Sequence, residues 1–242
     1  MSRYVNRIVT IGLVALLPAC ASTRNRAVKD TSKTFKTVVV DAGHGGKDSG
    51  AYRRYGPPEK LVTLDVAERL NHKLRESQLK TVMTRSSDVF IPLDERVNIE
   101  NSQMNSIFVS IHFNDSRRRG IHGFETYYHS SASFDLATRI QEKLTAIPHS
   151  ANGGVHTANF RVLRNATCPS VLVECGYLSN RNEGNLARDS EYRELLADRI
   201  AEAIVEQRYG ASVYHGSQVA AQPPQVDTPT GGTELAPTAG HH

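Results

Sequence analysis

Four side chains of the types used in metal-assisted hydrolysis stand at the ends of predicted secondary-structure elements. His44 follows the apolar run TVVVD, His112 closes the run SIFVSIH, and Glu174 closes the run SVLVE. Glu59 begins a segment whose apolar residues repeat at helical spacing. Two histidines and one carboxylate are a common ligand set for hydrolytic zinc, and a second carboxylate can act as a general base. The residue types therefore raise a zinc hydrolase as one hypothesis.

The same residues also have structural interpretations. The chain contains 10 histidines, so one histidine at a strand end carries little weight, and the HGG sequence that begins at His44 is compatible with a simple turn. Glu59 could be a favourable charge in the first turn of a helix. Glu174 is harder to explain in this way, because a carboxylate that ends an apolar strand needs a partner. Spacing alone leaves the metal and structural interpretations open.

Alternating strands and helices are predicted through most of the chain. Leu61, Leu64, Ala67, Leu70 and Leu74 recur at spacings of three and four, which predicts an amphipathic helix. Strands are expected at 37–41, 80–84, 106–112, 123–128, 159–164 and 170–174, and helices at 59–76, 92–103, 134–147 and 191–208. This order predicts an α/β fold with a single twisted, mostly parallel sheet flanked by helices. Ligands of such sheets gather at the carboxyl ends of the strands.

Five ordered sequence strings resemble the zinc-dependent N-acetylmuramoyl-L-alanine amidases, a family of bacterial cell-wall amidases. They are VVVDAGHGGKDSGA at 38–51, Glu59-Lys60 with Leu64, SIHFN at 110–114, GVHTANFRVLRN at 154–165 and VLVECGYLSN at 171–180. The resemblance covers about residues 37–209, which is nearly the whole patterned block.

The resemblance implies one Zn²⁺ per chain, with His44, Glu59 and His112 as ligands and Glu174 as the catalytic glutamate. It also implies a substrate and a bond: the amide between the lactyl group of N-acetylmuramic acid and the L-alanine of the stem peptide in peptidoglycan. Such a hydrolase would act in cell-wall remodelling, septum splitting or recycling.

Three further residues are candidates for substrate binding. His156 could donate a hydrogen bond to the substrate, and Arg117 begins a run of three arginines that could attract stem-peptide carboxylates. Asn114 ends the SIHFN segment and could either contact substrate or shape the loop. Solvated loop residues are the alternative for His156 and Arg117.

The interval between His112 and Glu174 bears on regulation. Regulated members of the family carry a helix in this interval that blocks the zinc. The strands and the helix predicted here occupy most of the interval. We therefore expect an open site and no obligatory activator protein.

The amino-terminal residues have the pattern of an export signal. Arg3 and Arg7 precede an apolar stretch at 8–17, and Leu17-Pro18-Ala19-Cys20 resembles a bacterial lipobox. We predict a signal peptide at 1–19, a lipid anchor on Cys20 and a tether at 20–35. The expected location is the periplasm, as a membrane-anchored lipoprotein. An ordinary secretory signal with an incidental Cys20 is the alternative.

Composition sets the remaining limits. Residues 36–210 form the predicted catalytic domain, and 211–242, rich in Ala, Gln, Pro, Thr and Gly, are expected to be a disordered tail. The formal net charge is +4, and no basic arm is present, so no nucleic-acid partner is expected.

Two other functions remain open: a zinc carboxypeptidase acting on stem peptides, and a non-catalytic cell-wall-binding lipoprotein. Ser77 and Lys80 have the S-x-x-K spacing of penicillin-binding proteins, which we interpret as coincidence because no KTG follows.

Overall fold

The computed structural model describes residues 27–52, 55–211 and 214. The predicted signal peptide, Cys20 and nearly all of the predicted tail lie outside these residues. Among the described residues, no helix has the length and apolar character needed to cross a membrane.

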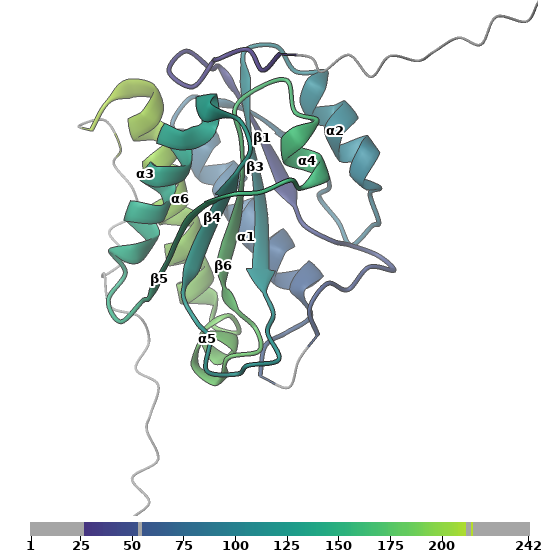
Figure 1. Ribbon diagram of the computed structural model, residues 1–242, viewed down its shortest axis with the longest axis vertical. Coiled ribbons are helices and arrows are strands. Elements are labelled where there is room, and N and C mark those ends of the chain that lie inside the picture. Colours follow the sequence, from purple (N-terminus) through teal and green to yellow (C-terminus); the bar gives the residue numbers. More distant parts are fainter. Residues whose placement is uncertain (1–26, 53–54, 212–213, 215–242) are drawn as a thin grey trace, which may run out of the picture.

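A six-stranded sheet forms the centre of the molecule (Figure 1). Its strand order is β2-β1-β3-β6-β4-β5, and every neighbouring pair is parallel except β4 and β6. The strands are β1 Thr37–Ala42, β2 Lys80–Met83, β3 Ser106–Asn114, β4 Phe124–Tyr128, β5 Asn152–Thr157 and β6 Ser170–Tyr177. The prediction of a mostly parallel sheet flanked by helices is confirmed.

Helices cover the two faces of the sheet unequally (Figure 1). The first face packs against three long helices: α1 Glu59–Glu76, α3 Phe134–Thr145 and α6 Ser190–Tyr209. The second face packs against the shorter α2 Leu93–Asn101 and α4 Arg161–Arg164. The remaining short helices are η1 Ser131–Ser133 and α5 Arg181–Leu186.

Side chains of β3 alternate between these two faces, as in any strand. Ile107, Val109 and Ile111 lie in the large core beneath α1, α3 and α6. Phe108 lies in the small core beside α2 and α4, and the next residue on its face is polar Ser110. The second face therefore changes from apolar to polar toward the carboxyl ends of the strands.

The predicted strand at 159–164 is wrong. Residues 161–164 form α4, and the strand lies earlier, as β5 Asn152–Thr157. Two adjacent glycines in β5 gave a turn-like sequence pattern. A Cβ atom on Gly153 would lie 2.4 Å from Cγ of Glu125 on β4, so the glycine allows close strand packing. In α4, the adjacent Val162 and Leu163 are both buried in the small core, and the amides of Leu163 and Arg164 donate to the carbonyl of Phe160, which closes a helical turn.

The folded block also extends beyond its predicted ends. Phe35 is fully buried in the large core, and the Thr31 hydroxyl donates a 2.6 Å hydrogen bond to the carbonyl of Ser106. Both residues lie in the segment predicted as a tether, whose last part thus belongs to the folded body. Tyr214, in the predicted tail, packs against the large core and donates from its hydroxyl to Asp198.

Candidate metal centre

His44 lies in the tight loop that follows β1. Its φ is 60°, and the glycines that follow it, Gly45 and Gly46, also have positive φ values. A Cβ atom on Gly45 would lie 2.1 Å from the carbonyl oxygen of Val89, so no larger residue fits there. The His44 Nδ1 atom lies 2.9 Å from Oδ2 of Asp48 in the same loop. The loop therefore fixes the orientation of the imidazole and directs its Nε2 atom away from Asp48.

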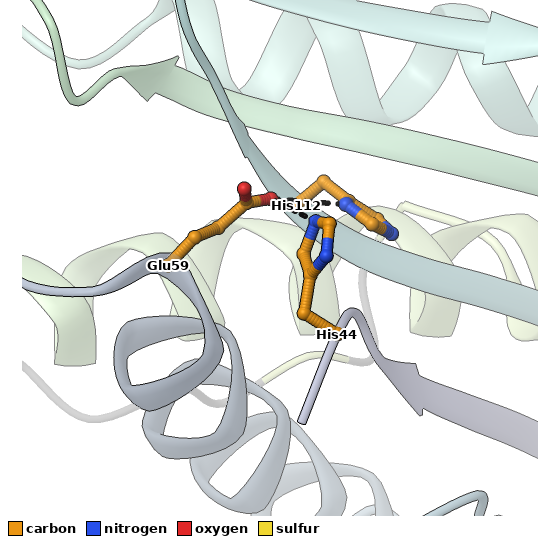
Figure 2. A group of neighbouring side chains, drawn as sticks. All are labelled: His44, Glu59 and His112. Atoms are coloured by element: carbon orange, nitrogen blue, oxygen red, sulfur yellow. Dashed lines mark hydrogen bonds and ion pairs between the residues drawn. The ribbon is translucent and has the colours of Figure 1, made fainter. Parts of the chain in front are cut away.

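Glu59 is the first residue of α1, and its side chain is buried. Its Oε1 atom lies 3.0 Å from His44 Nε2 and 3.0 Å from His112 Nδ1, as Figure 2 shows. The backbone amide of Ala51 donates to Oε2. Burial opposes ionisation of Glu59, but the hydrogen bonds and charges of the two histidines outweigh it and hold its pKa below the ordinary range.

His112 comes from β3 and lies edge-to-face with His44, with 4.9 Å between the ring centroids. Gly43 provides the space for this ring, because a Cβ atom there would lie 2.4 Å from it. One ligand atom each of His44, Glu59 and His112 lies within 4.8 Å of the others. Three residues from a loop, a helix and a strand thus converge on one point (Figure 2).

The geometry of these three residues fits a zinc ion. Two atoms that ligate tetrahedral zinc at about 2.1 Å are roughly 3.4 Å apart, which is close to the observed 3.0 Å separations. Two nitrogens and a carboxylate oxygen are donors that zinc prefers. Asp48 also fits, because a histidine ligand usually donates its other ring N–H to a carboxylate or carbonyl. Burial opposes protonation of His44, yet Glu59 and Asp48 raise its pKa to about 9, so the site attracts positive charge.

A buried polar network holds the loop that carries His44. Asp41 of β1 accepts hydrogen bonds from Thr84, Arg96 and Ser110, and all four residues are buried. Arg96 also donates to the carbonyls of Ala42 and His44. The second face of the sheet therefore positions the loop through a buried ion pair and hydrogen bonds.

Glu174 faces the same site from β6. It stands opposite His112 in the parallel pairing of β3 and β6, so both side chains lie on the second face of the sheet. Its buried Oε2 atom accepts no hydrogen bond from any residue that the structure describes. Burial raises the pKa of Glu174 to about 7, with smaller contributions from Glu59 and Glu125, against the lowering effect of His112.

A cleft of about 520 Å³ contains all four residues. It is lined by His44, Gly50, Ala51, Tyr52, Glu59, His112, Phe113, Asn114, Asp115 and Glu174. These residues come from the loop after β1, the start of α1 and the ends of β3 and β6. The sequence-predicted metal ligands and the predicted base therefore share one cleft.

The substrate-binding candidates lie in different places. Asn114 lines the cleft, whereas Arg117 is exposed on the loop after β3, and His156 is exposed on β5 outside the cleft lining. Ser77 lies at the end of α1, where its hydroxyl donates to the carbonyl of Lys73, and Lys80 starts β2. This pair is therefore remote from the metal centre, at the opposite end of the sheet.

Two carboxylates of the site were missed from the sequence. Asp48 contacts His44, and its four-residue spacing in the glycine-rich loop was the available signal. Glu125 of β4 accepts hydrogen bonds from Asn114, Tyr127 and Tyr177, and it stands opposite Glu174 in the antiparallel pairing of β4 and β6. The sequence around Glu125 gave no indication of a role in the site, because only the pairing of β4 with β6 brings this residue there.

Comparison with known proteins identifies the family of the chain. The profile of the N-acetylmuramoyl-L-alanine amidase family matches residues 38–206, which include all four site residues. The chain belongs to this amidase family. Its relatives include N-acetylmuramoyl-L-alanine amidase LytC of Bacillus subtilis, which is 38% identical over 174 residues. That match covers 70% of this chain and 35% of LytC, so the chain spans about a third of this amidase.

Solved structures of amidases have the same fold. The catalytic domain of the amidase CwlV from Bacillus (Paenibacillus) polymyxa var. colistinus is 38% identical, with a TM-score of 0.67 over 71% of this chain and 97% of that one. The CwlD amidase from Clostridioides difficile, solved in complex with the GerS lipoprotein, is 30% identical, with a TM-score of 0.68 over 71% of this chain and 98% of that one.

Proposed function

We propose that this amidase is a zinc-dependent hydrolase that cleaves the amide between N-acetylmuramic acid and L-alanine in peptidoglycan. The convergence of the ligand atoms of His44, Glu59 and His112 within 4.8 Å, in a cleft shared with Glu174, carries the proposal. A non-catalytic wall-binding protein would not need this complete set, and its buried carboxylates would be costly to maintain.

His44, Glu59 and His112 would hold the zinc ion through Nε2, Oε1 and Nδ1, the atoms that face one another. Zinc supplies a Lewis acid, which lowers the pKa of water and stabilises negative charge on a carbonyl oxygen. The Asp48 carboxylate accepts a hydrogen bond from His44 Nδ1 and keeps Nε2 available as the ligand atom.

Glu174 transfers the proton in this mechanism. Its unpartnered Oε2 accepts a proton from the water that attacks the lactyl carbonyl carbon. The same carboxyl group then donates the proton to the L-alanine nitrogen as the carbon–nitrogen bond breaks. The products are a lactyl carboxylate and a free alanine amine. A pKa near 7 suits a group that must both accept and donate a proton at neutral pH.

Product analysis tests the proposal. Purified peptidoglycan is digested with the full chain, with and without a chelator, and the products are identified by mass. Stem peptides that begin with free L-alanine, together with stem-free glycan, are expected, and the chelator should abolish both. Shortened stems still attached to muramic acid would instead indicate the carboxypeptidase alternative.

We also propose that Cys20 carries a lipid that anchors the exported enzyme to the membrane. The support is the lipobox-like sequence before Cys20, since a multiply acylated cysteine gives stable anchoring. Cys20→Ser should move the protein from the membrane fraction to the soluble periplasmic fraction. Unchanged fractionation, with a mature terminus at another residue, would favour an ordinary secretory signal.

The site is further proposed to need no activator. The cleft lining includes no residue from the interval between Asp115 and Glu174, where a blocking helix would lie. The purified full chain should therefore digest peptidoglycan without added protein. CwlD, solved in complex with a lipoprotein, is a family member against which this independence can be compared. A zinc-loaded but inactive chain that a partner switches on would contradict the proposal.

A further inference from the structure

Three aromatic side chains cluster beside the cleft: Tyr127 on β4, His156 on β5, and Phe160 directly before α4. The Tyr127 ring lies 5.5 Å from the His156 ring and 5.3 Å from the Phe160 ring, measured between centroids. Tyr127 is half-buried, whereas His156 is exposed and Phe160 is 42% exposed. We call Tyr127, His156 and Phe160 the aromatic shelf. The metal centre and the polar networks described above leave its exposed rings without a role.

Strand pairing places the shelf on the same face as Glu174. Glu125 stands opposite Glu174, and Tyr127 stands opposite Leu172, so Glu125, Tyr127 and Glu174 share the second face. His156 stands beside Tyr127 on β5. His156 lies two strands away from Glu174 and two residues further along the strand direction. The separation of the two backbone positions is therefore about 12 Å. A ligand held at Glu174 can therefore reach the shelf with its neighbouring part.

A continuous surface joins the cleft to the shelf. Asn114, which lines the cleft, donates to Oε2 of Glu125, and the Tyr127 hydroxyl donates to the same oxygen, both at 2.8 Å. Beyond Glu125 the neighbouring residue on β5 is Gly154. Because Gly154 has no side chain, the His156 ring lies over it, with Nε2 3.3 Å from where a Cβ atom would be and 2.8 Å from the carbonyl oxygen of Gly153.

The charges on the two sides of Glu174 differ. On the shelf side lies the carboxyl group of Glu125, which stands opposite Glu174 in the pairing of β4 with β6. Arg161 on that side is paired with Asp94, whereas Arg164 keeps its positive charge while it donates to the carbonyl of Asn159. In the opposite direction, beyond the carboxyl end of β3, the loop at 117–119 carries three consecutive arginines. A carboxylate-bearing stem peptide is therefore favoured on the loop side, where the positive charge is concentrated.

We propose that the aromatic shelf binds a sugar ring of the glycan strand, and thereby sets the direction in which the substrate lies. This inference rests on the proposed amidase function. A pyranose ring is uncharged and has a face of C–H groups, which packs on the electron-rich face of an aromatic ring. The glycan then lies over β4 and β5, the lactyl amide lies at Glu174, and the stem peptide extends toward Arg117.

Substitutions of the exposed rings test the shelf. Phe160→Ala and His156→Ala remove exposed side chains, and Tyr209→Ala is the matched control, because Tyr209 is also 42% exposed but lies at the end of α6. The first measurement compares kcat/KM for a disaccharide-bearing muramoyl peptide with that for a lactoyl peptide without sugar. The second measures by calorimetry the Kd for a stem-free GlcNAc–MurNAc oligosaccharide.

The expected result is a selective loss of sugar recognition. Phe160→Ala should lower kcat/KM for the sugar-bearing substrate about three- to tenfold, mainly through KM, and weaken oligosaccharide binding by a similar factor. The lactoyl peptide should be cleaved at the unchanged rate, and Tyr209→Ala should behave as wild type. Equal losses on both substrates, or unchanged oligosaccharide binding, would overturn the shelf. If the wild type cleaves neither substrate, the amidase proposal fails, and the oligosaccharide titration still decides the shelf.

Discussion

The two faces of the sheet use the same strands for different purposes. The first face is covered along its length by α1, α3 and α6, and its inward residues on β3 and β6 are Val, Ile, Phe and Cys. On the second face, α2 and α4 cover one end, and the other end carries His112 and Glu174. Each strand thus contributes alternate residues to stability and to chemistry.

This division explains how an exposed site can be rigid. His112 and Glu174 are held by strands whose intervening residues, Ile111 and Val173, are fully buried in the large core. A close-packed core resists the small displacements that would disturb a ligand set. The polar face therefore needs little apolar cover of its own at the carboxyl ends of the strands.

The largest expected effect is on zinc binding and activity, when a ligand on the polar face is removed. His112→Ala removes one of two imidazoles, so bound zinc and activity should be lost together, with activity reduced at least ~100-fold. Zinc content by plasma mass spectrometry and stem-peptide release are measured on the same preparation. The control is His72→Ala on the exposed surface of α1. A zinc-free variant that retains full activity would refute the metal site.

Truncating the apolar face should affect stability instead. Ile107→Ala, at the end of β3 remote from His112, leaves a cavity in the large core and should lower the free energy of unfolding by about 2–5 kcal/mol. Zinc content and kcat should be close to wild type at a temperature where the variant is folded. Ile121→Ala, at a 38% exposed isoleucine, is the control. Denaturant unfolding and kinetics test whether the faces separate as described, and a large fall in kcat without loss of stability would show that they do not.

Asp48→Asn should weaken zinc binding by removing the carboxylate that orients His44. The change removes the charge that orients His44 Nδ1, while the amide oxygen can still accept from the Gly50 amide. Zinc affinity should fall about 10- to 100-fold, as measured by competition with a chelator. Asp88→Asn is the control, because Asp88 binds Lys60 and the Gly46 amide without contacting a histidine. Equal affinities for the two variants would exclude the proposed role of Asp48.

Glu100 on α2 should have the smallest effect on the chemistry of the site, because it acts on the pH dependence of stability. It is fully buried against the second face, and burial raises its pKa well above the ordinary value. Above the unfolded-state pKa, the unfolded chain loses this proton while the folded chain keeps it. Stability therefore falls with rising pH until the folded-state pKa is passed, by at most about 1.4 kcal/mol per pH unit.

Glu100→Gln should remove this slope. The variant should be more stable than wild type at pH 8, and the difference should shrink toward pH 5. Urea unfolding at several pH values measures it, with Glu95→Gln on the exposed side of α2 as the control. A variant that is less stable than wild type at pH 8 would show that Glu100 is ionised and stabilising.

The sequence predicted the parts of the molecule that depend on local pattern. Apolar runs identified β1, β3 and β6, and helical spacing identified α1, whose start carries Glu59. Because these strands are parallel, their carboxyl ends meet, and the convergence of His44, His112 and Glu174 followed from strand order. The motif resemblance then predicted Glu59 as the ligand and Glu174 as the base.

Features that depend on packing between distant segments could not be predicted. The glycine pair lies in a strand through its pairing with β4, where Cγ of Glu125 occupies the space that a side chain at Gly153 would need. Glu125 itself joins the site only through the antiparallel pairing of β4 with β6. Likewise, Phe35 belongs to the core because α6 and the sheet leave room for it, which no local pattern indicates.

The most direct test of the central claim is zinc content and stem release measured together on Glu174→Gln. The claim is that three residues hold the metal and that Glu174, on the neighbouring strand, only transfers protons. The variant should therefore bind one zinc ion per chain, as wild type does, while its rate of stem-peptide release falls at least ~100-fold. Loss of zinc together with activity would show that Glu174 is a ligand, and an unchanged rate would show that it is not the base.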